Sequence, residues 1–167
     1  NSGKTWTISY SSLAASTDYK IRVTTGVKDL SGNSMSSQYE TSSGFTTADV
    51  VAPTLAEVTA VTTPTNDTTP NFTFSSSESG TISYGGSCSS STTTTTAGTN
   101  TVSFNALGDG TYSDCTLTLT DTAGNASTAL SVNSFTVDTT APTVAQVTAV
   151  TTPTNDTTPA YTFSSSE

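Results

Sequence analysis

The sequence predicts an all-β protein made of β-sandwich domains in tandem, and three observations lead to this fold class. Apolar and polar residues alternate in short runs bounded by turn residues, which is the pattern of half-buried strands. The chain of 167 residues contains 41 threonines and 28 serines, and the branched threonine side chain suits a pleated sheet. A long segment also occurs twice, 89 residues apart, a period that fits one sandwich domain.

Each expected strand rests on its own run of alternating residues. Near the start of the chain, Tyr19, Ile21 and Val23 alternate with polar residues and predict one strand. Further along, the alternating apolar pairs are Phe72 and Phe74, Ile82 and Tyr84, Val102 and Phe104, and Leu117 and Leu119. The strands expected there, in chain order, are 55–62, 71–75, 80–88, 91–97, 100–106, 111–120 and 128–137.

The internal repeat sets the domain organisation. Residues 52–78 and 141–167 differ at only four of 27 positions. The repeat predicts one complete unit over 52–138 and the N-terminal part of a further unit over 141–167. The remaining segment, 1–48, is then the C-terminal part of a preceding unit. We expect the sequence to be a window onto a longer tandem array.

The segment 1–48 carries the same marks as the end of the complete unit. Asp29–Asn33 reads Asp-Leu-Ser-Gly-Asn, and Asp121–Asn125 reads Asp-Thr-Ala-Gly-Asn. Each loop is followed by a strand that ends in Phe-Thr and then by an aspartate, Asp49 or Asp138. These shared marks indicate that 1–48 closes a domain related to the complete one.

Basic residues are confined to the start of the chain. Lys4, Lys20, Arg22 and Lys28 face thirteen Asp and Glu, the net charge is −9, and there is no histidine. Because nucleic-acid binding depends on Lys and Arg, the sequence predicts no nucleic-acid partner. No apolar run reaches the roughly 18–20 residues that cross a bilayer, so no membrane insertion is expected. Without histidine, an evident nucleophile and base, or a glycine-rich phosphate loop, we expect no enzyme.

Several motifs carry a resemblance to a known family. The stretches DGTY, TDTAGN, FTVDTTAP and TNDTTP resemble the bacterial immunoglobulin-like repeats of large surface adhesins and biofilm-associated proteins. The opening stretch TDYKIRVTTGVKDLSGNSM resembles a second bacterial Ig-like type, from surface-layer and cell-wall proteins. The resemblance implies tandem Ig-like sandwiches of Greek-key topology, a bacterial cell-surface location, a spacer or adhesive role and, often, calcium at domain junctions.

Sandwich topology predicts which loops share an end of the complete unit. The upstream end, where a linker arrives, and the downstream end, where the next linker leaves, each collect acidic residues. No Lys or Arg follows Lys28 to neutralise them, and Ca²⁺ takes six to eight oxygen ligands in proteins. The sequence therefore predicts Ca²⁺ at the junctions. The candidate ligands are Asp49, Glu78, Asp121 and Asn125 upstream, and Asp67, Asp109 and Asp138 downstream, where the next unit brings Glu167.

The Asp-x-x-Gly-Asn loops also have a simpler explanation. An aspartate accepts hydrogen bonds from the backbone two residues on, and Gly or Asn adopts a positive φ, which makes a stable turn without a metal. A plain turn and a calcium-binding loop both remain open on the sequence alone.

The two cysteines are predicted to form a disulfide. Counting from Ile82 and Tyr84 places Cys88 on the inward face of its strand, and counting from Leu117 places Cys115 inward as well. The two strands are antiparallel neighbours in such a sandwich. A bridge across this separation stabilises by about 3 kcal/mol in the chain-entropy model and implies an oxidising, extracellular setting. Two buried free thiols in a reducing compartment are the alternative.

These inferences predict an extracellular structural segment, the stalk of a bacterial surface adhesin or fibre. Its partners are then neighbouring repeats or other copies of the chain, with a glycan or a host or matrix ligand bound elsewhere in the parent protein. Two alternatives stay open. Residues 141–167 of one chain could complete 1–48 of another, which makes a filament by strand complementation. The chain could instead be a carbohydrate-binding module, with Trp6, Tyr10 and Tyr19 as its aromatic platform.

Overall fold

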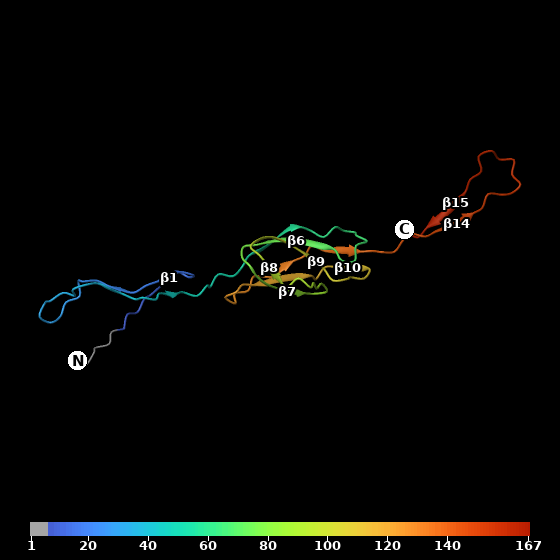
Figure 1. Cartoon of the computed structure of the whole chain (residues 1–167). Coiled ribbons are helices and arrows are strands. Elements are labelled where there is room, and N and C mark those ends of the chain that lie inside the picture. Colours follow the sequence, from blue (N-terminus) through green and yellow to red (C-terminus); the bar gives the residue numbers. More distant parts are fainter. Residues whose placement is uncertain (1–6) are drawn as a thin grey trace.

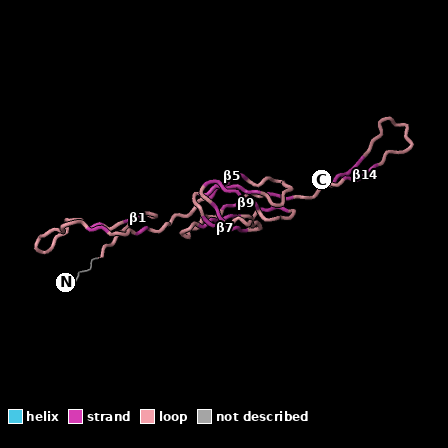
Figure 2. The backbone as a smooth tube through the Cα atoms, in the orientation of Figure 1, coloured by secondary structure: helices cyan, strands magenta, loops and turns pink. Residues whose placement is uncertain are grey.

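The computed structural model describes residues 7–167, and within that range it contains strands but no helix. The all-β fold class is thereby confirmed. The chain forms an N-terminal part (residues 7–48), a central sandwich (55–137) and a C-terminal hairpin (144–165), one after another (Figure 1). Short strands joined by long loops make up each part (Figure 2). No helix that could cross a membrane occurs in the described range.

The N-terminal part is one long hairpin divided into two short antiparallel ladders. The ladders pair β1 (Asp18–Tyr19) with β4 (Phe45–Thr46) and β2 (Arg22–Val23) with β3 (Tyr39–Glu40). The Tyr19 ring stacks on Phe45 with centroids 5.8 Å apart. On the exposed side, Arg22 forms an ion pair with Glu40, with 2.7 Å between the charged atoms. The predicted strand over Tyr19, Ile21 and Val23 is therefore present, but it is interrupted before Arg22.

The central sandwich consists of two main sheets and one short ladder. The first sheet has the order β5 (Leu55–Thr59), β6 (Asn71–Ser76), β9 (Gly98–Ser103). The second has the order β12 (Leu130–Ser131), β11 (Thr116–Thr120), β7 (Gly80–Gly85), β8 (Thr94–Thr95). The ladder pairs β10 (Gly110–Tyr112) with β13 (Phe135–Val137). All strands named here pair antiparallel.

The core lies between the sheets and follows the alternation of the sequence. Phe72 and Phe74 on β6, and Leu117 and Leu119 on β11, are completely buried, while the threonines between the two leucines are only half-buried. Burial of such side chains is the main favourable contribution to folding of a domain this small. The buried apolar residues are Val61, Phe72, Phe74, Ile82, Cys88, Val102, Phe104, Cys115, Leu117, Leu119, Val132, Phe135 and Val137.

Two predicted strands are divided in the structure. The expected strand 111–120 becomes β10 and β11, and 128–137 becomes β12 and β13, because β10 pairs only with β13 while β11 pairs with β7 and β12. Tight packing marks the break. Gly86 has φ of +75°, and a Cβ atom there would lie 2.1 Å from the Asp114 carbonyl oxygen. The uniform alternation of the sequence cannot show such a change of partner, because it reports only which face is buried.

The first predicted strand of the sandwich also ends early. It was expected over 55–62, but β5 ends at Thr59 after a bulge. The chain continues past a cis Thr63–Pro64 peptide bond, and Thr65 then forms a parallel bridge with Val137 of β13. The segment after β5 thus reaches the downstream end of the sandwich and contacts the strand that leads into the next linker.

The C-terminal hairpin reproduces the local structure of the segment it repeats. It pairs β14 (Val144–Thr148) with β15 (Thr162–Ser165), with the same register and the same bulge as β5 with β6. Its surroundings differ. Phe74 of β6 is 0% exposed, whereas the equivalent Phe163 of β15 is 60% exposed. The repeated sequence therefore specifies the hairpin, while the remaining strands of a domain provide its burial.

Candidate junction site

Three carboxylates meet at the upstream end of the central sandwich. Asp49 lies in the linker after β4, Glu78 in the turn between β6 and β7, and Asp121 directly after β11. One carboxylate oxygen from each lies within 4.8 Å of the others. We call these three residues the upstream acidic group. Its members come from segments far apart in the chain, so the fold brings them together.

The loop after β11 holds Asp121 rigidly. Asp121 Oδ1 accepts hydrogen bonds from the backbone amides of Ala123 and Asn125, each at 2.8 Å, and Oδ2 accepts one from Asn125 Nδ2 at 2.8 Å. Gly124 supplies the positive φ, 96°, that the turn needs. The residue is only 8% exposed. The Asn125 side chain is the largest of the influences that lower the pKa of Asp121 from its ordinary 3.8, against the opposing effect of burial.

The other two members are positioned by shorter contacts. Asn125 Nδ2 also donates to the Asp49 carbonyl oxygen at 3.3 Å, which ties the linker to the loop. Asp49 Oδ1 accepts from the Val51 amide at 3.0 Å. The turn that carries Glu78 is closed by Ser76, whose hydroxyl donates to the Glu78 carbonyl oxygen at 2.6 Å. The linker and two loops of the sandwich therefore converge on one point.

The chemistry of this group fits a hard divalent cation. Carboxylate oxygens are the ligands that Ca²⁺ prefers. Among the described residues the ion pairs are those of Glu40 with Arg22 and Lys20, in the N-terminal part, so no basic side chain neutralises the upstream acidic group. Three carboxylates this close repel one another unless a proton or a cation joins them. A calcium ion at this position would be held by Asp49, Glu78 and Asp121.

The N-terminal part contains a second copy of the loop without neighbouring acids. Asp29 Oδ1 accepts from the amides of Ser31 and Asn33, each at 2.9 Å, and Asn33 Nδ2 donates to Oδ2 at 3.0 Å. This is the same pattern as in the Asp121 loop. The plain-turn explanation is therefore sufficient for the shape of both loops. Only the approach of Asp49 and Glu78 distinguishes the Asp121 loop as a candidate cation site.

The downstream acids are distributed differently. Asp138 and Glu167 line one open groove together with Thr62, Pro64, Thr65, Asn66 and Thr140. They are the counterparts, 89 residues on, of Asp49 and Glu78. Asp67 accepts hydrogen bonds from Thr69 within its own loop, at 2.8 Å from the amide. In the described part of the chain the downstream acids do not form a group of three, as the upstream ones do.

Asp109 has a role that the sequence did not suggest. Its carboxylate accepts hydrogen bonds from Thr139 and Thr140 of the departing linker. These three hydrogen bonds also lower the pKa of Asp109 below 3.8, the Thr139 side chain contributing most. The signal available in the sequence was the pair Thr139-Thr140, which replaces Val50-Val51 of the first linker.

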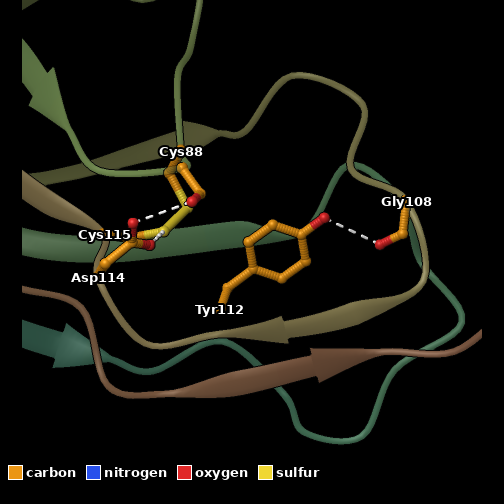
Figure 3. The surroundings of a disulfide bond; sticks show 6 residues. Cys88, Gly108, Tyr112, Asp114 and Cys115 are labelled. Atoms are coloured by element: carbon orange, nitrogen blue, oxygen red, sulfur yellow. Dashed lines mark hydrogen bonds between the residues drawn. A yellow bond between two sulfur atoms is a disulfide. The ribbon is translucent and has the colours of Figure 1, made fainter.

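Cys88 and Cys115 are joined by a disulfide in the structure, with their Cα atoms 5.3 Å apart. Cys88 follows β7 and Cys115 precedes β11, and these two strands are hydrogen-bonded neighbours. Figure 3 shows the bond beside Asp114, with the Tyr112 hydroxyl directed at the Gly108 carbonyl oxygen, 3.0 Å away. The disulfide thus holds the chain at the break between β10 and β11.

The aromatic residues do not form a platform on the central sandwich. Phe72, Phe74, Phe104 and Phe135 are buried and stack on one another in the core. Of the residues considered for sugar stacking, Trp6 lies outside the described residues, Tyr10 is exposed but not in a strand, and Tyr19 stacks on Phe45. No observation on the described residues therefore favours the carbohydrate-binding alternative.

Two family models match the chain, and both are described as bacterial Ig-like domains. The first covers residues 47–139, and the second covers residues 1–47. No curated protein and no solved structure matches the chain. The first match includes the arriving linker, all strands of the central sandwich and the first residues of the departing linker. The boundary between the two matches falls just before Asp49 of the upstream acidic group.

Proposed function

Because this chain belongs to the bacterial Ig-like domains, we propose that it is a structural segment of an extracellular stalk, of the kind that carries a surface adhesin or builds a fibre. The observation that carries the proposal is the tandem arrangement. The chain contains a complete sandwich followed, at a spacing of 89 residues, by a second copy of its first hairpin. Domains joined end to end by short linkers form a spacer rather than a catalytic site.

Further features of the chain support a spacer. Threonine and serine cover the outer faces of the sheets, and the net charge of −9 favours solubility and keeps neighbouring stalks apart. Pro53 and Pro142 restrict the backbone in the two linkers. The Cys88–Cys115 bridge suits an oxidising extracellular space. Stalk partners are then neighbouring repeats, while a glycan or matrix ligand would bind elsewhere in the parent protein.

We further propose that Ca²⁺ stiffens the upstream junction. Asp49 belongs to the linker, whereas Glu78 and Asp121 belong to the sandwich, so a cation held by all three would fix one to the other. Its contribution would be to neutralise the three charges and to limit bending of the linker.

Small-angle X-ray scattering and thermal unfolding of the whole chain, with Ca²⁺ and with EDTA, test both proposals. We expect an extended particle in both conditions, with a higher melting temperature and a larger maximum dimension in Ca²⁺. Glu78→Gln should remove the response to Ca²⁺. Glu57→Gln, which changes the same residue type on β5 outside the acidic group, should keep it.

The possible outcomes separate the two proposals. A compact particle in both conditions would contradict the stalk. An extended particle whose melting temperature and dimensions are identical in Ca²⁺ and EDTA would refute the cation site and leave the stalk standing. A Ca²⁺ response that survives Glu78→Gln would place the ion at some other position.

One observation favours a second candidate, a filament formed by strand complementation. Val144, Tyr161 and Phe163 of the C-terminal hairpin form an exposed apolar face. Against this candidate, residues 1–47 match a different family model from the central sandwich, whereas 141–167 repeat 52–78. The two incomplete parts thus belong to different domain types. Light scattering that shows concentration-dependent polymers of the chain alone would favour the filament, and a monomer at all concentrations would exclude it.

A further inference from the structure

The loop before β10 is connected to the departing linker through a single carboxylate. Asp109 Oδ1 accepts hydrogen bonds from the Thr139 amide at 3.0 Å and from the Thr139 hydroxyl at 2.7 Å. Asp109 Oδ2 accepts from the Thr140 hydroxyl at 2.9 Å. Both oxygens of one side chain are thus occupied by two consecutive linker residues. Hydrogen bonds to an ionised acceptor are shorter and stronger than neutral ones.

The segment just before this contact is already fixed to the sandwich by its backbone. The Asp138 amide donates to the Thr65 carbonyl oxygen at 2.9 Å, and the Thr65 amide donates to the Thr136 carbonyl oxygen at 3.0 Å. Asp138 Oδ1 then accepts from the Thr140 amide at 3.0 Å. The linker is therefore gripped on one side by the segment around Thr65 and on the other by Asp109, through Thr140, immediately before Pro142 and the next domain.

The first linker lacks the side chains for such a contact. Its residues at the positions of Thr139 and Thr140 are Val50 and Val51, which are 71% and 58% exposed. The local turn is the same, because Asp49 Oδ1 accepts from the Val51 amide at 3.0 Å. Only the hydroxyl groups that a preceding domain could hold are missing. The two linkers thus share a backbone turn but differ in their attachment to the domain before them.

We propose that Asp109 is a clasp that fixes the departing linker and so sets the direction in which the following domain leaves the sandwich. The downstream junction is stiff because the preceding domain grips it, whereas the junction at Val50 and Val51 bends on its N-terminal side. The consequence for stalk mechanics rests on the proposed function. The clasp itself requires no metal, since its donors are all linker hydroxyl and amide groups.

Amide hydrogen exchange, measured by nuclear magnetic resonance on the full chain in EDTA, tests the clasp. Asp109→Ala should lower the protection of the Thr139 amide at least tenfold. The Thr140 amide, which donates to Asp138, is the internal reference and should change less. Asp67→Ala is the matched control, because Asp67 lies at the same end of the sandwich and its carboxylate accepts hydrogen bonds only from Thr69.

Nitrogen-15 relaxation on the same samples reports the orientation of the next domain. In the unmodified chain, the amides of β14 and β15 should tumble with those of β6 and β11. In Asp109→Ala they should show a lower heteronuclear Overhauser effect and independent motion. The double variant Thr139→Val, Thr140→Val reproduces the residues of the first linker and should have the same effect, which keeps the test valid if Asp109→Ala does not fold.

Unchanged Thr139 protection and unchanged relaxation in Asp109→Ala, or in the double valine variant, would overturn the clasp. An equal effect of Asp67→Ala would overturn it as well, because the change would then reflect loss of a charge at that end. Since all samples contain EDTA, the result is independent of whether the upstream acidic group binds Ca²⁺.

Discussion

Single residues explain where the two copies of the repeat diverge. Glu57 Oε1 accepts a hydrogen bond from Asn133 Nδ2 at 2.8 Å, Asn71 is bonded to Ser103, and Phe72 is completely buried between Phe74 and Phe104. Three of the four differences between the copies fall at these positions, and the fourth, Leu55, packs against the same core. The copies therefore differ at positions through which the central hairpin contacts the rest of its own domain.

The exchange of Phe72 for the tyrosine found at position 161 should destabilise the sandwich. Phe72→Tyr places a hydroxyl in an apolar core, and burying such a group without a partner costs about 1–3 kcal/mol. Urea unfolding should show this loss. Tyr161→Phe is the control and should leave the unfolding midpoint unchanged, because Tyr161 is 57% exposed. Equal midpoints for Phe72→Tyr and the unmodified chain would mean that the core relaxes around the hydroxyl.

Burial at the level of residues could be predicted where the alternation is regular. The pairs Phe72 and Phe74, and Leu117 and Leu119, are buried as their spacing indicates. The role of Asp109 could not be predicted, because its partners lie 30 residues away in a loop without any periodic pattern. Residue type alone assigned it to a metal site, and only the geometry shows that linker hydroxyls occupy both of its oxygens.

At the level of elements, the Asp-x-x-Gly-Asn loop is a self-contained unit. Its two copies have the same hydrogen bonds although they belong to parts that match different family models. All partners lie within five consecutive residues, so the sequence is sufficient to specify the loop. For the same reason the loop shape alone carries no information about a metal.

The loop in the N-terminal part should respond to acid in a defined direction. The Asn33 side chain, the largest cause, holds the pKa of Asp29 below its ordinary 3.8. Since the folded-state pKa is the lower one, the contribution of this carboxylate to stability is complete above pH 3.8 and is lost as the pH falls through the lowered pKa. A carbon-13 titration should show that Asn33→Ala raises the pKa of Asp29 towards 3.8, whereas Ser34→Ala leaves it unchanged. A pKa unaffected by Asn33→Ala would refute this account of the loop.

The disulfide should be the main covalent contribution to the central sandwich. It closes a loop with a sequence separation of 27 residues, and the chain-entropy model gives about 3 kcal/mol for such a loop. We expect Cys88→Ser, Cys115→Ser and reduction of the unmodified chain each to lower the free energy of unfolding by that amount. Adding reductant to either variant should cause no further loss. Mass spectrometry of the unreduced chain provides the direct check, and two free thiols would refute the bridge.

Element boundaries show the limit of pattern arguments. The expected strands 71–75, 80–88 and 100–106 coincide closely with β6, β7 and β9, whereas 111–120 and 128–137 each divide in two. Alternation depends on which face is buried, and that face does not change at the break. The partner strand does change, and pairing between distant strands leaves no periodic trace in a single sequence.

At the level of the whole molecule, the acids and the linkers occupy the same places. The upstream acidic group and the Asp109 clasp both lie where a linker meets the sandwich. No Lys or Arg follows Lys28, so charge repulsion along the array favours an extended chain. The positions that determine how domains are oriented are thus also the positions of unpaired charge.

The central sandwich should be stable without the C-terminal hairpin. The strands β14 and β15 pair only with each other, and their apolar side chains are exposed. A chain that ends after Thr140 keeps the clasp and the whole core, and it should unfold at the same urea midpoint as the full chain. A chain that ends after Val137 lacks the clasp residues and serves as the comparison. A large loss of stability in the longer truncation would show that the hairpin packs against the sandwich.

The sequence by itself determined the strand class, the 89-residue repeat and the hydrogen-bonded loops, because each depends on residues close together in the chain. The tertiary structure alone decided three other features. It buries Phe74 but leaves Phe163 exposed, it gathers Asp49, Glu78 and Asp121 within 4.8 Å, and it places Asp109 against the linker. These features depend on contacts between segments distant in sequence, whose geometry is set by the packing of the two sheets.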